Sequence, residues 1–192
     1  MQQSDLLSHL IDVFGKNGLW ADGVELIGSW AFYMYQKHLG VRATPIKTMD
    51  VDFLLPRPYP KRMAVDLHNV LRPLGFSQHF NSDGSNYFLH GDFKVEFLTP
   101  ERGKGDSKPL NVDPLHLKVV PLRFMDMLKD GPILLKDEGS DVLVPNPKNY
   151  ALHKLLIAQR RSYQPKREKD IEQAVCTLAV VDRHSFVETF ES

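Results

Sequence analysis

Two aspartates separated by a single residue lie inside an apolar run, residues 49–55, which reads MDVDFLL. A β-strand directs successive side chains to opposite faces, so Asp50 and Asp52 point the same way while the residue between them points the other way. Leu54 shares the face of the two acids, which indicates that this face is partly buried. Neighbouring carboxylates on a buried surface repel one another unless a cation lies between them. The pattern therefore predicts a strand whose acids bind a metal ion.

A candidate phosphate-binding turn precedes this strand. The short apolar run 24–27 is followed by Gly28 and Ser29 and then by an aromatic segment, residues 30–39, which we expect to be a helix. In a strand that turns sharply into a helix, glycine allows close backbone approach, and the free N–H groups of the first helical turn form an anion site. We therefore expect Gly28 and Ser29 to bind the outer phosphates of a nucleotide.

A third acid, Glu96, lies in residues 93–98, which read FKVEFL and alternate like a second strand with one mixed face. Each motif taken alone also has a purely structural interpretation. Gly-Ser is a common turn, and Asp-x-Asp is common on the solvated face of an edge strand. A phosphate-binding turn followed by acids on one strand face is, however, what metal-assisted phosphoryl chemistry needs, and the combination favours that chemistry.

Together, the Gly-Ser turn, the Asp-Val-Asp strand and the later Glu96 resemble the signature of the nucleotidyltransferase superfamily. The resemblance implies an α/β (α+β) fold, with a mixed β-sheet flanked by helices and a mainly helical C-terminal part. One departure is that 20 residues, 30 through 49, separate Ser29 from Asp50, which is more than is usual in the family. The predicted helix and the loop 40–48 must absorb the excess.

The resemblance also implies an activity. Asp50, Asp52 and Glu96 would act as catalytic residues and as ligands of Mg²⁺ or Mn²⁺, the kind of hard cation that oxygen ligands prefer. The reaction would move a nucleoside monophosphate from an NTP to a hydroxyl acceptor, which could be RNA, a protein or a small molecule. A non-catalytic nucleotide- or RNA-binding module on the same fold is the alternative. The sequence does not select the NTP, the acceptor or the oligomeric state.

A basic helix is predicted towards the C-terminus. Residues 148–169 contain seven basic residues and one acid, Glu168, so the local field is positive although Lys plus Arg and Asp plus Glu both total 24 in the whole chain. At helical spacing Leu152, Leu155 and Leu156 share one side, which we expect to face inward. Lys154 then lies on the other side, either as part of a solvated face or lining the cleft opposite the acids.

The segment YALHKL at 150–155, followed by Lys169-Asp170, resembles the C-terminal helices of bacterial nucleotidyltransferase-like proteins, including abortive-infection toxins. In those proteins a lysine on such a helix approaches the nucleotide, which implies a nucleotide-binding role for Lys154. Arg161 is predicted to bind the nucleotide from the same helix. Arg160 and Lys166 are weaker candidates for contacts with phosphate charge.

The remaining patterns organise the chain around these motifs. We expect a first helix from residue 4, a helix over 61–74, an antiparallel meander over 76–98, an extended segment at 115–121, a short helix at 122–128, a hairpin at 133–145, and two strong helices at 149–161 and 166–181. The charged, glycine-rich stretch 101–109 is the best candidate for a boundary. The predicted domains are a catalytic domain, 1–110, and a mainly helical domain with a short hairpin, 111–192.

Composition excludes several other classes. Hydrophobic residues make up 42% and charged residues 25%, as in ordinary globular proteins, and the single Cys176 excludes an intramolecular disulfide. No apolar run approaches the ~18 residues of a membrane span, so we expect no membrane partner and a cytoplasmic location. The eight histidines are scattered and lack the spacing of zinc-binding motifs, and no Walker loop or Gly-x-Ser-x-Gly motif is present.

Overall fold

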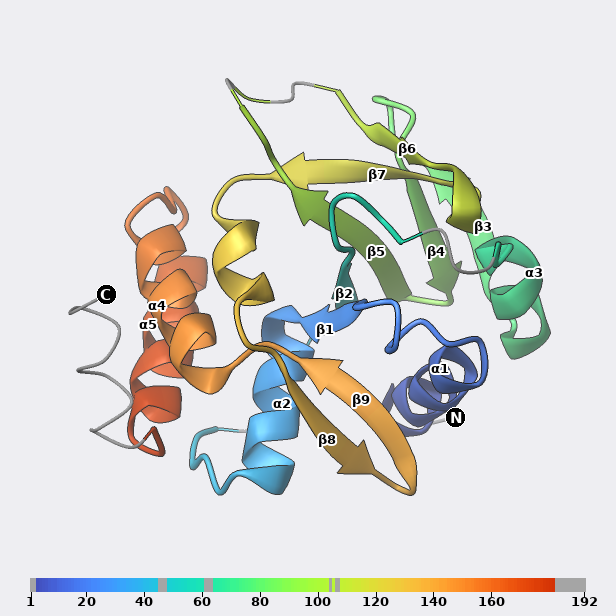
Figure 1. Cartoon of the computed structure of the whole chain (residues 1–192). Helices are drawn as coiled ribbons and strands as arrows, with labels where there is room; N and C mark the ends of the chain where they lie inside the picture. The colour runs from blue at the N-terminus through green and yellow to red at the C-terminus, as the bar shows by residue number, and fades with distance from the viewer. Residues whose placement is uncertain (1–2, 45–47, 61–63, 104, 106–107, 182–192) are drawn as a thin grey trace.

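The computed structural model describes residues 3–44, 48–60, 64–103, 105 and 108–181 (Figure 1). Its centre is a mixed seven-stranded sheet in which β1-β2-β5-β4-β3 are consecutive neighbours, while β7 pairs with β5 and β6 pairs with β7. β2 runs parallel to β5, and so does β7, whereas the other pairs are antiparallel. The strands are β1 Glu25–Ile27, β2 Asp50–Leu54, β3 Ser77–Phe80, β4 Asn86–His90, β5 Phe93–Pro100, β6 Leu110–Val112 and β7 Leu117–Leu122.

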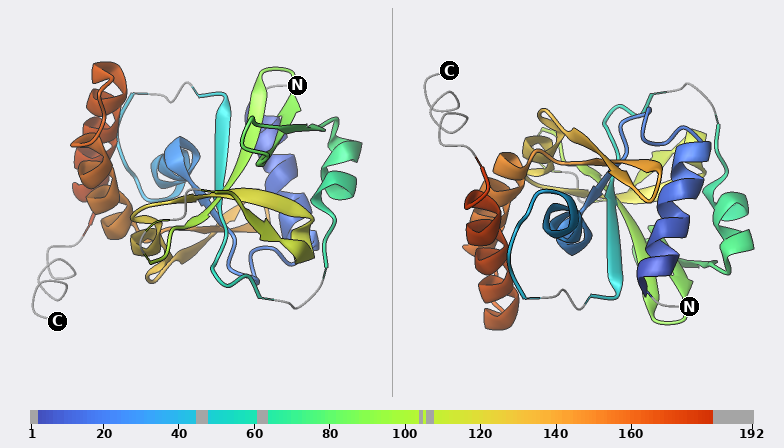
Figure 2. Two further views of the ribbon diagram at one scale, coloured as in Figure 1. Left: turned by 90° about the horizontal axis from the view of Figure 1, so that it is seen from above. Right: turned by 90° about the horizontal axis from the view of Figure 1, so that it is seen from below.

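Helices lie on both sides of this sheet, which confirms the predicted fold class (Figure 2). Figure 2 shows α2, α4 and α5 on one side of β2 and α1 and α3 on the other. The helices are α1 Gln3–Lys16, α2 Gly28–His38, α3 Leu67–Leu71, α4 Pro147–Ala158 and α5 Gln164–Leu178, with 3₁₀ turns η1 Arg72–Leu74, η2 Asp113–Leu115 and η3 Met125–Lys129. The predicted hairpin is present as β8 Ile133–Asp137 and β9 Ser140–Val144.

One face of the sheet carries the main core. α1 is amphipathic, and its Phe14 ring lies 4.5 Å from the Phe53 ring of β2, which in turn lies 5.6 Å from the Phe97 ring of β5. All three side chains are at most 1% exposed. Alternation along β2 and β5 therefore gives one face to aromatic packing and leaves the other face to the acids.

The other face is covered by η3 and by α4. A small apolar cluster forms there between strand residues Ile27 and Leu54 and the η3 residues Met125 and Leu128. A buried ion pair, Lys129 Nζ to Glu25 Oε1 at 2.6 Å, fastens η3 to β1. This cover is what converts the acid-bearing face into an enclosed site.

Several elements differ from the prediction. The helix expected over 61–74 is an α-helix only over Leu67–Leu71, extended by η1, and residues 61–63 lie outside the described ranges. The extended segment expected from residue 115 begins at Leu117, because Asp113–Leu115 form a 3₁₀ turn that ends at His116 with φ 53°. The short strand β6 was not predicted.

Two further expectations concern the chain as a whole. β6 and β7 belong to the central sheet although they follow the predicted boundary at residue 110, and the division into two domains stays a prediction. Within the described ranges, no helix is both long enough and apolar enough for a bilayer crossing.

Candidate functional site

A cavity of 310 Å³ separates the acid-bearing face of the sheet from α4 and the turn that follows it. All of the predicted site residues line it except Ser29 and Arg160, the latter one of the two weaker candidates. Those that line it are Gly28, Asp50, Asp52, Glu96, Lys154, Arg161 and Lys166. The site pocket, as we call this cavity, therefore brings together residues from two strands, one helix start and the C-terminal helices.

The register of β2 against β5 explains why the acids share this pocket. In the parallel pair Asp52 lies opposite Glu96, and Asp50 lies opposite Lys94. Residues paired in register point to the same face of a sheet, so all three carboxylates belong to one face. Glu96 is not free, because its Oε1 lies 2.7 Å from Lys94 Nζ.

Negative charge accumulates at Asp52. Burial, together with the nearby charges of Glu96 and Asp50, raises the pKa of its carboxyl group from 3.8 to about 6, while Lys154 opposes the shift. A raised carboxyl pKa means that the ionised form lacks sufficient compensation where it lies. Oxygen donors in this condition suit a hard divalent cation. Among the described residues, however, no three acids, histidines or cysteines are already arranged as a metal group.

Gly28 is required where β1 turns into α2. Its φ is +66°, and a Cβ atom built on it would lie 2.7 Å from Asp52 Oδ2. Only glycine combines this backbone conformation with such a close approach. The first turn of α2 thereby lies directly against the carboxylate. Ser29 points elsewhere, since its Oγ accepts a hydrogen bond from Gln173 Nε2 of α5 at 3.3 Å.

Lys154 reaches the site pocket as half of a buried ion pair. Its Nζ lies 2.7 Å from Asp170 Oδ1, and Arg161 Nε lies 3.1 Å from Asp170 Oδ2. Burial lowers the pKa of Lys154, and the charge of Asp170 works against that decrease. Asp170 on α5 therefore holds two of the cationic groups that the sequence assigned to the nucleotide.

The orientation of α4 differs from the prediction. Leu152, Leu155 and Leu156 were expected to face inward but are only partly buried, whereas Tyr150 and Lys154 are buried. Polar contacts to neighbouring elements orient this helix. The Tyr150 hydroxyl donates to the Gly28 carbonyl oxygen at 3.0 Å, and Lys154 pairs with α5. Apolar periodicity alone therefore missed the burial of Tyr150 and Lys154, although Ala151 and Ala158 on the predicted inner side are buried.

Sequence reasoning assigned no site role to Tyr150, His153 or Asp170. His153 lines the site pocket, is 5% exposed, and its Nε2 has no hydrogen-bond partner within the described part of the chain. Burial and the charge of Lys154 lower its pKa to about 4, so the imidazole is neutral at pH 7. Only their positions in the sequence could have indicated these residues. Tyr150 and His153 precede Lys154 on the same helix, and Asp170 directly follows Lys169.

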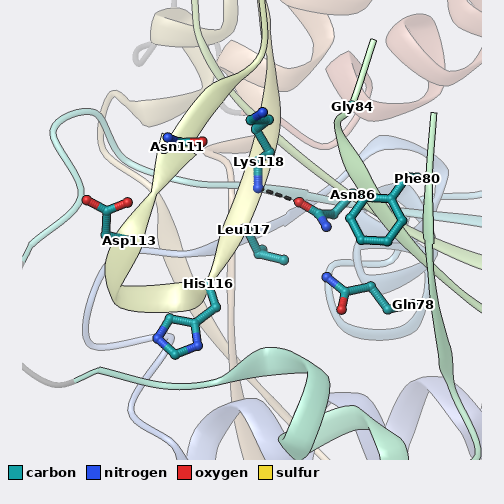
Figure 3. A pocket seen from close by; sticks show the side chains of 9 residues that line it. All are labelled: Gln78, Phe80, Gly84, Asn86, Asn111, Asp113, His116, Leu117 and Lys118. Carbon is teal, nitrogen blue, oxygen red and sulfur yellow. Dashed lines mark hydrogen bonds between the residues drawn. The ribbon is translucent and has the colours of Figure 1, made fainter. Parts of the chain in front are cut away.

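A second hollow lies away from these residues, between the β3–β4 hairpin and the β6–β7 pair (Figure 3). Figure 3 shows Gln78, Asn86 and Lys118 around it, with the Lys118 backbone N–H donating to Asn86 Oδ1. Its lining contains only one acid, Asp113. Since phosphoryl transfer needs clustered acids or a cation site, this hollow is not a candidate for the chemistry.

Comparison with known protein families yields a match that spans nearly the whole chain. A family model described as nucleotidyltransferase matches residues 6–192. No curated protein sequence matches significantly. Among solved structures, a crystal structure of an antigenic nucleotidyltransferase-like protein from Paracoccidioides brasiliensis has a TM-score of 0.51 at 15% identity and covers 93% of this chain and 78% of that chain. At that identity the likeness supports the fold alone.

Two other similar structures are those of the antibiotic-resistance factor ANT(2″)-Ia. Its solution structure has a TM-score of 0.49 at 11% identity, with 98% of this chain and 93% of that chain covered. Its crystal structure in complex with adenylyl-2″-tobramycin has a TM-score of 0.48 at 12% identity, with 94% and 97% covered.

Proposed function

Since the chain belongs to the nucleotidyltransferase family, we propose that it transfers a nucleoside monophosphate from an NTP to a hydroxyl acceptor and that its site pocket performs this reaction with Mg²⁺ or Mn²⁺. One observation supports the proposal: the acids Asp50, Asp52 and Glu96 line the same cavity as the basic residues Lys154, Arg161 and Lys166. Acids on one wall suit a cation, and basic groups on the other suit a triphosphate.

The phosphates would lie between the start of α2 and the C-terminal helices. The free N–H groups of the first turn of α2 provide an anion site, and the positive φ of Gly28 brings that turn against Asp52. Lys154, Arg161 and Lys166 line the opposite wall and would neutralise phosphate charge. Ser29 would have to exchange its contact with Gln173 to donate its hydroxyl to the outer phosphates.

Nucleotidyltransferases in general use divalent metal ions, and the oxygen donors of this pocket fit one. Asp50 and Asp52 would hold the ion, joined by Glu96 once it exchanges Lys94 for the cation. A bound Mg²⁺ would stabilise charge on the phosphates and make the acceptor hydroxyl more acidic. The hydroxyl oxygen forms a bond to the α-phosphorus, the bond from that phosphorus to the β-bridging oxygen breaks, and pyrophosphate leaves. The hydroxyl proton passes to a pocket carboxylate.

Activity can be tested with each of the four labelled NTPs, Mg²⁺ or Mn²⁺, and cell extract. We expect one fraction of the extract to become labelled by wild-type protein and not by Asp52→Asn. The matched control is Asp92→Asn, which changes an exposed aspartate in the β4–β5 turn. Wild-type protein that binds NTP but labels nothing would instead be a nucleotide-binding module.

Metal binding can be tested without activity. A ligand present at a hundredfold excess over its dissociation constant stabilises the folded state by about 2.7 kcal/mol, so Mg²⁺ should raise the melting temperature. Asp50→Asn removes one donor and should abolish most of this gain. Equal shifts in wild type and Asp50→Asn would contradict a role for the acids as ligands.

Lys154 needs a test that separates its structural role from nucleotide binding, because it is buried beside Asp170. Lys154→Met and Asp170→Asn should each destabilise the fold, since each leaves one buried partner unpaired. The double variant should recover part of that stability. It should still bind NTP about ten- to a hundredfold more weakly, because a charge-assisted contact of about 1.5–3 kcal/mol is lost. Wild-type affinity in the double variant would make Lys154 a structural residue only.

A further inference from the structure

Another cavity, distinct from the hollow in Figure 3, adjoins the site pocket on the outer side of η3 and α4. It has a volume of 270 Å³, and we call it the vestibule. The two cavities share five lining residues, which are Leu122, Met125, His153, Ile157 and Arg161. A molecule lying in the vestibule therefore reaches the same side chains that border the acid face.

The vestibule differs from the site pocket in its charged lining residues, because the site pocket has both acids and bases. Three arginines, Arg123, Arg160 and Arg161, line it, and no acid does. Arg161 is held by Asp170, and Arg123 Nε lies 3.1 Å from Glu101 Oε1. Arg160 forms no ion pair with any described residue and lies on the protein surface. With no acid in its lining and with Arg160 outside any such ion pair, the vestibule has a net positive charge, which disfavours a positively charged acceptor and favours an anionic one.

An aromatic ring accompanies these charges. The Arg160 guanidinium lies 4.6 Å from the centroid of the Phe124 ring. Phe124 has φ +66°, a left-handed conformation that is unfavourable for a bulky residue. Such outliers persist where surrounding contacts hold them, often at ligand sites. Stacked aromatic and arginine side chains in a basic groove are typical of surfaces that bind single-stranded nucleic acid.

His153 supplies an independent sign that a polar ligand belongs at this junction. It lines both cavities, it is 5% exposed, and its Nε2 has no partner among the described residues. A buried polar atom without a hydrogen bond is unfavourable, and a hydroxyl or base edge of a ligand would provide that bond.

We propose that the vestibule binds the 3′-terminal nucleotides of a single-stranded nucleic acid and delivers the terminal hydroxyl to the acid face. This inference rests on the proposed function and names its acceptor class. The terminal hydroxyl oxygen bonds to the α-phosphorus of the NTP, pyrophosphate leaves, and the strand becomes one nucleotide longer. Arg123 and Arg160 contact strand phosphates, and the Phe124 ring stacks on a base.

The test uses labelled RNA and DNA oligonucleotides of one sequence, with binding followed by fluorescence anisotropy over a range of salt concentrations. Arg123→Gln and Arg160→Gln should each weaken strand binding about tenfold. Each should also lower the slope of log affinity against log salt by about 0.7, the value for one phosphate contact on a single strand. NTP affinity, measured by calorimetry, should not change. Arg72→Gln, in an exposed residue of η1, is the matched control and should bind like wild type.

Each outcome bears on one proposal. Normal strand binding and extension by Arg123→Gln and Arg160→Gln would overturn the vestibule while leaving the transfer reaction intact. A loss of NTP affinity in these variants would also overturn the vestibule proposal, because it would assign the vestibule to the nucleotide. The same holds if the wild-type protein binds no strand and transfers the nucleotide to a protein or to a cationic small molecule. Salt-dependent strand binding that the variants weaken, without extension by any NTP, would support the vestibule and count against the transfer reaction. Comparison of the RNA and DNA arms identifies the strand.

Discussion

The two faces of β2 and β5 are built from alternate residues of the same strands, yet one face is aromatic and the other is acidic. On one face Phe53 and Phe97 pack with Phe14 at ring distances of 4.5 to 6.2 Å, and all are essentially inaccessible to solvent. On the other face Asp52 and Glu96 lie side by side beneath Lys154. The three rings carry no polar atom, whereas the acid face gathers carboxylates whose ionised forms are disfavoured by burial and by one another.

This difference separates stability from chemistry within one pair of strands. Burial of apolar rings stabilises the fold, by roughly 25 cal/mol for each Å² removed from water. Burial of Asp52 does the reverse, because it raises the carboxyl pKa to about 6 and so opposes ionisation. A folded protein retains such a group only if the other face supplies the stability. Substitutions on the two faces should therefore have separable effects.

The largest expected effect is the loss of transfer in Asp52→Asn. Removal of this carboxylate should decrease the rate by about 10²- to 10⁴-fold, the usual contribution of a group that handles charge or a proton. The melting temperature at pH 7 should not decrease, since a buried ionised group becomes neutral. Rate measurements and thermal unfolding of the same sample test this, and a rate within tenfold of wild type would remove Asp52 from the mechanism.

The matching substitution on the aromatic face is Phe53→Ala. Truncation of a fully buried phenylalanine should decrease the free energy of unfolding by about 3–5 kcal/mol, measured by urea denaturation. Phe80→Ala, at a side chain that is 66% exposed, is the control and should change stability by no more than about 0.5 kcal/mol. If the remaining folded Phe53→Ala protein has lost activity, the two faces are not independent.

The pH dependence of stability should report the acid face directly. Folding raises the pKa of Asp52 from 3.8 to about 6, so the folded state binds the proton more tightly than the unfolded chain. The stabilisation from protonated Asp52 is present below pH 4 and is lost as the pH rises through 6. At about 1.4 kcal/mol for each pKa unit, the loss is about 2–3 kcal/mol.

Asp52→Asn removes this contribution while leaving those of Glu25 and His153, whose pKa values also shift. The variant should therefore be more stable than wild type at pH 7.5 in EDTA, and the difference should disappear near pH 4. Parallel stability curves for the two proteins across this range would contradict the charged, uncompensated state of Asp52.

The smallest effect on stability, and the finest probe of the acid face, is Gly28→Ala. An alanine held at the positive φ of residue 28 should lower the free energy of unfolding by about 1–2 kcal/mol. The new Cβ would also displace Asp52 Oδ2, from which it would be 2.7 Å away. Gly91→Ala is the matched control, because Gly91 has φ +57° and no atom within 4 Å of the Cβ position. Both variants should lose similar stability, and only Gly28→Ala should lose transfer activity.

The local patterns of the sequence were sufficient for the strand faces and for the turn that we propose to bind phosphate. Alternation along residues 49–55 places Asp50 and Asp52 on one side of β2, whatever the strand packs against. The turn after β1 follows from Gly28, whose required φ few other residues adopt. The longer spacing before Asp50 did not change the fold: α2 takes up Gly28–His38, and residues 45–47 of the predicted loop lie outside the described ranges. These features depend on neighbours in the chain, which is why a single sequence reveals them.

Tertiary structure decided what faces the acids. The contact between Tyr150 and Gly28 joins residues 122 positions apart, and Gln173 reaches Ser29 across 144. Such contacts set the rotation of α4 and turned Lys154 towards Asp170, although the spacing of the leucines predicted another interior face. The third strand interaction of β5, with β7, likewise came from beyond the predicted boundary. Burial and charge compensation depend on all the elements packed around a residue, so they arise only when distant segments meet.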